Sequence, residues 1–493
     1  MERIWNFFEN MNEYVYVADA DTHELVYMNK KMRDTYGIHS KEELAGKKCY
    51  ELLQNSSLPC TICNNDELQE GQFKEWRYFN PLLNKYFKIK DTVVEDNGRR
   101  YRIEIALNIS SQEHQKNVVR RYEKLEKIVV TGCLPQKYAA EVFPALTEGD
   151  VFLGINDYDL LPSALETAYR TGERVNLVGK GADTFRFART LTTAPYLAYL
   201  KIADGCYNHC TYCLIPKIRG KYRSYPMEKL LEEAKELGEV KELVLVAQDT
   251  TRYGEDLYGE NRFPQLIRRL SLLDNIGSIR LLYCYPDAFS DELIEEIRTN
   301  DKVIKYADIP LQHSENRILK LMNRRGTRED YLALIAKLKA RIPGIALRST
   351  FISGFPSETE EEFEAMQAFL KEAELFNCGF FAYSREPDTA AAKMRGQVHY
   401  KTKERRVRAL YETQRQISEK ILSAFKGKTL RVLCEGIDYD KQLFAGRAYF
   451  SAPEIDGRIY FNAPEAEEGK EYDVVVSDVS APDLFGATKD YSA

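Results

Sequence analysis

Three cysteines stand close together in the segment KIADGCYNHCTYCLIP, with the spacing Cys206-x3-Cys210-x2-Cys213. Three thiolates on one short loop can bind three irons of a [4Fe-4S] cluster, which leaves the fourth iron without a protein ligand. A zinc site usually has four ligands in C-x2-C pairs, and core cysteines do not gather in a loop that contains glycine and asparagine. The spacing therefore predicts a [4Fe-4S] cluster with one open iron.

The elements that must position this loop follow from the pattern between residue 196 and about residue 384. Six apolar strands alternate there with amphipathic helices, the strands being YLAYLKIA, ELVLVAQ, SIRLLYC, YADIPLQ, GIALRSTFISG and NCGFFAYS. Repeated strand–helix units predict a parallel sheet, curled into a partial (β/α)6 barrel. The cysteine loop directly follows the first strand, at the barrel end where reactive groups lie.

The CxxxCxxC loop after a first barrel strand, with the aromatic Tyr212 before its last cysteine, resembles the radical S-adenosylmethionine (SAM) superfamily. The resemblance implies that Cys206, Cys210 and Cys213 hold the cluster and are the catalytic cysteines, and that Tyr212 belongs to the cofactor-binding residues. It also implies that the open iron binds the amino and carboxylate groups of SAM, whose one-electron cleavage gives a 5′-deoxyadenosyl radical.

A narrower resemblance extends over residues 196–493, about three fifths of the chain. The strings RGKYRS, LVLVAQDTTRYGEDLYG, DIPLQHSENRILKLMNRR, LRSTFISGFPSETEEEF and YSREPDTAA are similar to the methylthiotransferases, within them the branch that modifies ribosomal protein uS12. This implies addition of a methylthio group to the β-carbon of an aspartate. One SAM supplies the methyl group, another supplies the radical, and a reductant such as flavodoxin or ferredoxin supplies electrons.

Further candidates for the cofactor site lie at later strand ends. Gln248 and Asp249 end the second strand, and Gln312 and His313 follow the fourth. The Gln248 amide and Asp249 carboxylate could bind the ammonium or ribose of the cofactor, with a solvated loop as the alternative. Gln312 and His313 could belong to the cofactor pocket, with a structural role for the histidine as the alternative. Arg348 could clamp the cofactor's carboxylate, with a plain ion pair as the alternative.

Ser349 lies beside Arg348 in the strand that precedes GFPSETEEEF, and we count it among the candidate cofactor-binding residues. Pro356 predicts a turn after this strand. Ser357 and Glu360 fit a capping box at the start of the following helix, whose N-terminus could receive an anion.

The N-terminal part departs from the methylthiotransferases. That family begins with an α/β domain whose three cysteines hold a second [4Fe-4S] cluster, but only the later half is visible. Cys133, in VTGCLPQ, matches the third of those ligands, and a single thiolate does not hold a cluster. Residues 1–110 form instead an α+β module that resembles a PAS sensor domain.

This module contains three more cysteines, in the string KKCYELLQNSSLPCTICNN. Cys60 and Cys63 have ligand-like C-x2-C spacing, and Cys49 lies nearby. Three alternatives stay open: the cysteines complete a second cluster with Cys133, they form a local redox or metal site, or they have no role.

Composition narrows the class of protein. The chain has 493 residues, 44% hydrophobic and 30% charged, which excludes collagen-like and wholly disordered proteins. It has no apolar run of about 18 residues and no leader pattern, so a cytoplasmic location is expected. The net charge of the chain is −6, and the segment 427–493 contains 7 basic and 13 acidic residues. An acidic tail disfavours tRNA and suits a basic ribosomal protein.

The expected architecture is α/β with added domains. The ranges are 1–110 for the PAS-like domain, 111–127 for a linker helix, 128–185 for a partial methylthiotransferase domain, 192–425 for the radical SAM core, and 427–493 for a β-barrel TRAM domain. Two alternatives to uS12 modification stay open: a tRNA methylthiotransferase, and a PAS-gated sensor or fusion relic that cleaves SAM without transferring sulfur.

Overall fold

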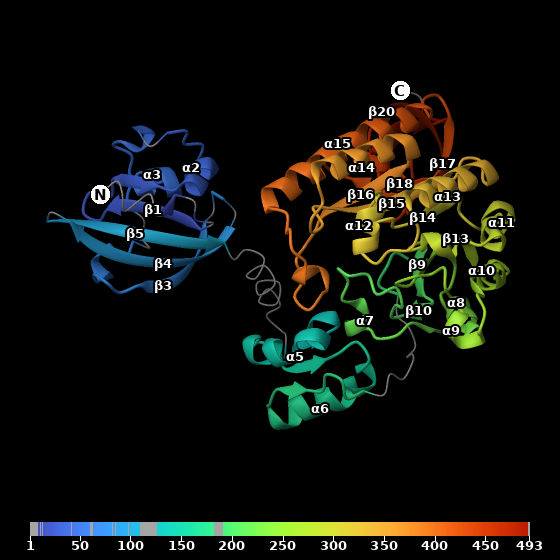
Figure 1. Cartoon of the computed structure of the whole chain (residues 1–493), viewed down its shortest axis with the longest axis horizontal. Helices are drawn as coiled ribbons and strands as arrows, with labels where there is room; N and C mark the ends of the chain where they lie inside the picture. Colours follow the sequence, from blue (N-terminus) through green and yellow to red (C-terminus); the bar gives the residue numbers. More distant parts are fainter. Residues whose placement is uncertain are drawn as a thin grey trace. The chain divides into compact units, whose positions relative to one another are not determined.

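The computed structural model describes residues 8–9, 11, 13–40, 42–59, 63–80, 82–83, 85–96, 98–108, 126–181 and 191–491. The chain divides into two compact units, Met1–Ile128 and Val129–Ala493 (Figure 1). The predicted linker helix falls almost wholly outside the described residues, as does Cys60.

The first unit is an antiparallel five-stranded sheet with short helices over one face (Figure 1). The strand order is β2-β1-β5-β4-β3. Side chains alternate between the faces of a strand, so every second residue points toward the helices. The elements are β1 (Tyr14–Asp19), β2 (Leu25–Met28), α2 (Lys30–Tyr36), η2 (Glu42–Leu44), α3 (Cys49–Gln54), η3 (Asn65–Glu67), β3 (Lys74–Asn80), β4 (Lys85–Asp96) and β5 (Arg99–Asn108).

The second unit begins with a small parallel sheet, in the order β6-β7-β8. Gly132 joins the first strand to the following helix with φ of 101°, a conformation that favours glycine, and Cys133 is the first residue of the helix. The elements are β6 (Val129–Thr131), α5 (Cys133–Ala145), β7 (Val151–Leu153), η4 (Tyr158–Leu160), α6 (Leu161–Thr171) and β8 (Val175–Asn176).

The barrel core consists of two parallel three-stranded sheets, ordered β13-β12-β9 and β14-β15-β16. A parallel bridge between Ile279 and Val303 links the two halves, and helices lie on the outer side (Figure 1). The six predicted strands are all present, and the partial (β/α)6 architecture is confirmed. They are β9 (Leu197–Lys201), β12 (Val240–Val246), β13 (Ile276–Leu281), β14 (Tyr306–Asp308), β15 (Ala346–Ser353) and β16 (Asn377–Ala382).

Shorter strands and the covering helices complete this core, and buried aliphatic and aromatic side chains fill the space between strands and helices. These elements are β10 (Ala203–Asp204), α7 (Ile215–Ile218), β11 (Arg223–Ser224), α8 (Met227–Glu236), α9 (Glu255–Tyr258), α10 (Phe263–Ser271), η5 (Pro286–Ala288), α11 (Asp291–Thr299), α12 (Asn316–Leu321), α13 (Arg328–Arg341), α14 (Glu360–Ala373), η6 (Ala391–Lys393) and α15 (Tyr400–Ser423).

The C-terminal segment forms the predicted small barrel, closed in the order β17-β18-β19-β21-β20. Its strands are β17 (Thr429–Asp438), β18 (Leu443–Arg447), β19 (Ile459–Asn462), β20 (Glu471–Ser480) and β21 (Asp483–Thr488). A buried ion-pair cluster ties it to the barrel core. Glu242 Oε1 lies 2.5 Å from Arg280 Nε, and Glu242 Oε2 lies 2.9 Å from Arg447 Nη1.

The predicted helix cap before α14 is wrong by two residues. Thr359, not Ser357, is the N-cap: its hydroxyl accepts from Glu362 N, and Glu362 accepts from Thr359 N. An N-cap needs an extended backbone, which Thr359 has (φ −84°, ψ 173°), whereas Ser357 is left-handed with φ of 67°.

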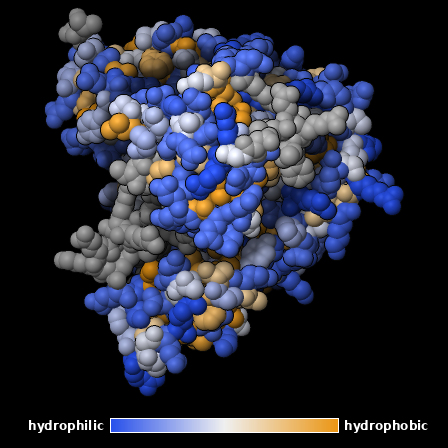
Figure 2. Space-filling model, turned by 90° about the vertical axis from the view of Figure 1, so that its left-hand side faces the viewer, coloured by the Kyte–Doolittle hydropathy of each residue, from blue (hydrophilic) through white to orange (hydrophobic). Residues whose placement is uncertain are grey.

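The face drawn in Figure 2 is mostly hydrophilic, with hydrophobic side chains in separate groups. Within the described ranges, the helices are too short or too polar to cross a membrane.

Candidate active site

The cysteine loop is fixed between two parts of the barrel core. Gly205 precedes it with φ of 73°, and a Cβ there would meet Lys221 O at 2.2 Å, so this close approach requires glycine. Thr211 N donates to Met322 O at 3.0 Å, and the Thr211 hydroxyl donates to Leu321 O at 2.8 Å. The C-terminal end of α12 therefore holds the loop in place.

Polar groups surround the three sulfur atoms. Asn208 donates from its backbone N to Cys206 Sγ at 3.4 Å, and Ile215 N lies equally far from Cys213 Sγ. Arg324 Nη1 lies 3.9 Å from Cys210 Sγ. Burial raises the pKa of Cys206, and burial raises that of Cys213 to about 11. Donors aimed at sulfur compensate the charge of thiolate ligands.

The three thiols line one cavity of about 920 Å³ at the C-terminal ends of the strands. Across the described part of the chain, no three His, Cys, Asp or Glu side chains are arranged around a single metal ion. A cluster distributes its thiolates over separate irons, so its ligands need not converge on one point. Three thiols around a large cavity with sulfur-directed donors thus fit a [4Fe-4S] cluster better than a single ion.

Four of the seven predicted cofactor-binding residues line this cavity: Tyr212, Gln248, Gln312 and Arg348. Gln248 Oε1 is buried and has no hydrogen-bond partner in the described ranges of the chain. A buried acceptor without a partner is costly unless a bound group donates to it. Gln248 is therefore well placed for a donor such as an ammonium or hydroxyl group.

Asp249 and Ser349 are buried but do not line the cavity. Asp249 Oδ2 accepts from Asn208 Nδ2 at 3.0 Å, and the same amide lies 3.5 Å from Cys206 Sγ. Ser349 Oγ accepts from Leu311 N at 3.2 Å. Asp249 thus supports the cysteine loop through Asn208, and Ser349 links the segment after β14 to β15.

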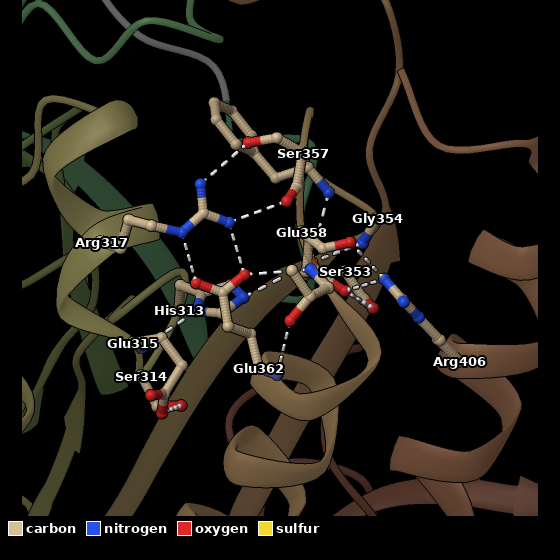
Figure 3. A network of polar contacts seen from close by, with 12 residues as sticks. His313, Ser314, Glu315, Arg317, Ser353, Gly354, Ser357, Glu358, Glu362 and Arg406 are labelled. Carbon is tan, nitrogen blue, oxygen red and sulfur yellow. Dashed lines mark hydrogen bonds and ion pairs between the residues drawn. The ribbon is translucent and has the colours of Figure 1, made fainter. Parts of the chain in front are cut away.

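His313 is fully buried, and its side chain also lies outside the residues that line the cavity. Its Nδ1 accepts from Glu315 N at 3.0 Å, and its Nε2 lies 3.4 Å from Glu358 Oε2 (Figure 3). Glu358 in turn pairs with Arg406 of α15 at 2.6 Å. This network holds the loop after β15 against α15.

Three arginines line the cavity: Arg219, Arg324 and Arg348. Arg219 pairs with Asp204, and the other two differ in their partners. Arg348 Nη1 lies 2.8 Å from Asp308 Oδ1, and Arg348 Nε lies 3.3 Å from Asp456 Oδ1. Its charge is already balanced, which does not favour the predicted carboxylate clamp. Arg324 has no carboxylate partner among the described residues, and its Nε lacks any hydrogen-bond partner. It stacks 4.0 Å from the ring centre of Tyr285 and donates to Pro310 O.

A loop of the C-terminal barrel, residues 451–457, reaches the same cavity. Pro453, Glu454 and Ile455 line it. Asp456 anchors the loop by accepting from the Tyr306 hydroxyl at 2.7 Å and by pairing with Arg348. Glu454 is exposed and has φ of 66°, which is unusual for a residue with a side chain. Arg324, Asn208 and Glu454 are not among the predicted site residues, because their place at the cavity depends on long-range packing.

Cys133 lies near this site but does not line the cavity. Arg219 Nη2 donates to Cys133 Sγ at 3.3 Å, and Arg219 Nη1 lies 3.1 Å from Asp204 Oδ1. Arg219 does line the cavity, so one side chain connects Cys133 to it. Cys49 and Cys63 belong to the first unit, Met1–Ile128.

Comparison with known proteins gives the class. A model of the radical SAM superfamily matches residues 200–370, and a model of the TRAM domain matches residues 427–488. A solved structure of the radical SAM methyltransferase TsrM from Kitasatospora setae, with cobalamin and a [4Fe-4S] cluster bound, has 16% identity and a TM-score of 0.41, covering 57% of this chain and 69% of its own.

Curated relatives are much more similar. The ribosomal protein uS12 methylthiotransferase RimO of Lachnoclostridium phytofermentans is 43% identical over 371 residues, covering 74% of this chain and 84% of its own. RimO of Clostridium novyi is 45% identical over 337 residues, covering 68% and 76%. The chain therefore belongs to the RimO family of radical SAM methylthiotransferases. A [4Fe-4S] cluster and SAM are the cofactors of this enzyme class.

Proposed function

We propose that this enzyme adds a methylthio group to the β-carbon of an aspartate in ribosomal protein uS12. The observation that carries the proposal is one cavity that joins the three loop thiols to an acidic loop of the C-terminal barrel. The RimO relatives are named ribosomal protein uS12 methylthiotransferases. When bound, the cluster and SAM supply the radical that removes a hydrogen atom, and SAM supplies the methyl group.

The chain's own residues hold and orient these groups. Cys206, Cys210 and Cys213 bind the cluster, and Asn208, held by Asp249, donates to Cys206 Sγ. Gln248 and Gln312 accept or donate hydrogen bonds at the cofactor. We assign the cofactor's carboxylate to Arg324 rather than Arg348, because Arg348 pairs with two carboxylates whereas Arg324 has no carboxylate partner among the described residues.

The acidic C-terminal barrel supports a protein substrate. Its 7 basic and 13 acidic residues repel a phosphate backbone and attract a basic polypeptide. Glu454 brings one of these negative charges to the cavity rim. We assign Glu454 to a lysine or arginine beside the target aspartate. The electron comes from outside the chain, from a reductant such as flavodoxin or ferredoxin.

Two variants in the C-terminal barrel test whether the substrate is a protein rather than tRNA. Glu454→Gln should raise the KM for a uS12 peptide about tenfold, since it removes one charge-assisted contact, and should leave SAM cleavage without peptide unchanged. Glu465→Gln is the matched control, because Glu465 is exposed on the same barrel and does not line the cavity. Mass spectra that show a modified nucleoside and no modified peptide would refute the protein substrate.

A second function is favoured by one observation: of the three cysteines that hold the second cluster in the methylthiotransferases, only the third has a match in this sequence, Cys133. The enzyme would then cleave SAM without transferring sulfur. A Cys133→Ser variant distinguishes the two functions. If Cys133→Ser still cleaves SAM but no longer methylthiolates the peptide, the result supports sulfur delivery through Cys133. A wild-type enzyme that releases 5′-deoxyadenosine and never modifies the peptide supports the second function.

A further inference from the structure

The first unit places charged side chains on the face of its sheet that points toward the helices. Arg102 and Glu104 are two residues apart on β5, so their side chains lie on the same face, and Asp91 lies opposite Glu104 on β4. Arg102 and Asp91 are 5% and 0% exposed. Such a face is normally apolar, because burial of a charge is costly unless it is paired.

The charges on this face do not balance. Arg102 Nη2 lies 3.0 Å from Asp91 Oδ2 and 2.8 Å from Glu104 Oε2, so one guanidinium serves two carboxylates. Asp91 Oδ2 has further donors in Trp76 Nε1 and Asn64 Nδ2. Within the described part of this unit, Glu104 gains one further donor, the Tyr16 hydroxyl at 2.9 Å. Arg102 Nε and Asp91 Oδ1 are buried and have no hydrogen-bond partner among the residues that the structure describes. When Glu104 is ionised, the described residues of the cluster therefore carry one excess negative charge.

A cavity of about 50 Å³ adjoins Glu104, with room for a molecule of a few non-hydrogen atoms. Aromatic rings from β1, β3, β4, α2 and α3 surround it: Tyr14, Tyr16, Tyr36, Tyr50, Trp76, Tyr78 and Phe87. Arg102 and Glu104 are the charged residues among those that line it. Lys31 contacts the ring of Tyr14 at 4.5 Å but does not line the cavity.

We propose that this cavity binds a small organic cation, whose ammonium group pairs with the Glu104 carboxylate and whose alkyl groups contact the surrounding aromatic rings. A carboxylate within an aromatic cage is the arrangement that recognises alkylammonium groups. The cation supplies the positive charge that the cluster lacks. This site is separate from the SAM cavity and does not depend on the proposed methylthiolation.

The protonation of Glu104 gives the binding a characteristic pH dependence. Burial raises the pKa of Glu104 to about 7, with Asp91 acting in the same direction and Arg102 opposing it. Tyr16, Cys49 and Cys63 also face the cluster. At pH 6 the carboxyl is largely neutral, and at pH 8 it is ionised. Cation affinity should therefore rise between pH 6 and pH 8.

The test uses the full chain and pairs of probes with the same shape. tert-Butylammonium and tert-butanol differ in charge but hardly in volume, and tetramethylammonium is a second cation of similar size. Calorimetric titration at pH 8 should show binding of at least one cation about tenfold tighter than tert-butanol. Equal affinity of both cations and the alcohol, or no binding of either cation, would overturn the proposal.

A variant pair locates the site. Glu104→Gln keeps the side-chain size and should weaken cation binding at least about tenfold, and it should remove the change between pH 6 and pH 8. Glu95→Gln is the matched control, because Glu95 is exposed on neighbouring β4. Unchanged cation affinity in Glu104→Gln would show that Glu104 does not hold the cation and would also overturn the proposal.

Discussion

Arg324 and Arg348, two of the arginines that line the cavity at the cysteine loop, should respond to the same substitution in opposite ways. Arg324→Gln removes a cation that has no carboxylate partner among the described residues, whereas Arg348→Gln removes the partner of both Asp308 and Asp456. If Arg324 binds the carboxylate of SAM, the variant loses one charge-assisted hydrogen bond, about 1.5–3 kcal/mol. The Kd for SAM should then rise by about 10- to 150-fold.

The cost to folding should follow the reverse order. Arg324→Gln loses a hydrogen bond to Pro310 O and a stacking contact with Tyr285, together about 1–2 kcal/mol. Arg348→Gln leaves two buried carboxylates without their cation, which typically costs about 3–5 kcal/mol. Urea unfolding of both variants measures this difference.

The binding assay is equilibrium titration of SAM into anaerobically reconstituted enzyme, with Arg324→Lys as the control that keeps the charge. The lysine variant should recover part of the lost affinity. The reasoning is refuted if Arg324→Gln binds SAM as tightly as the wild type, or if Arg348→Gln weakens SAM binding more than Arg324→Gln while its free energy of unfolding is unchanged.

Two further predictions concern stability. Glu242→Gln should lower the free energy of unfolding by about 3 kcal/mol, because it leaves buried Arg280 and Arg447 without their shared carboxylate. Urea unfolding measures this loss, and the exposed control Glu465→Gln should change the free energy of unfolding by less than about 0.5 kcal/mol. In the first unit, burial raises the pKa of Glu104 from 4.5 to about 7, so between these pH values the native state binds a proton that the unfolded state releases. The free energy of unfolding should therefore fall by about 3 kcal/mol from pH 4.5 to pH 7. Glu104→Gln should lack this fall. Tryptophan fluorescence follows this unit, since Trp5 and Trp76 are the chain's two tryptophans, and identical pH profiles of wild type and variant would contradict the argument.

Local pattern was sufficient to predict the barrel strands and the cysteine loop. Apolar runs and helical periods carry the strand–helix alternation, and the three thiols lie within eight residues of one loop. The C-terminal barrel was likewise visible as short alternating strands.

Side-chain direction could not be predicted in the same way. Asp249 and His313 follow strands as expected, yet their side chains contact Asn208 and Glu358 rather than the cavity. Glu454 reaches the cavity from more than two hundred residues away in sequence, through packing that involves Arg348 and Asp456. The helix cap shifted from Ser357 to Thr359 because backbone conformation, not residue type alone, decides a cap.

The central claim is that Cys206, Cys210 and Cys213 together hold an iron–sulfur cluster, and iron and sulfide analysis of anaerobically reconstituted variants tests it most directly. Cys284 lines the same cavity and is the matched control. We predict about four irons per chain if this is the single cluster, or about eight if a second one forms. Cys210→Ala should lose about four of them, while Cys284→Ala keeps them all. An unchanged iron content in Cys210→Ala would contradict the account.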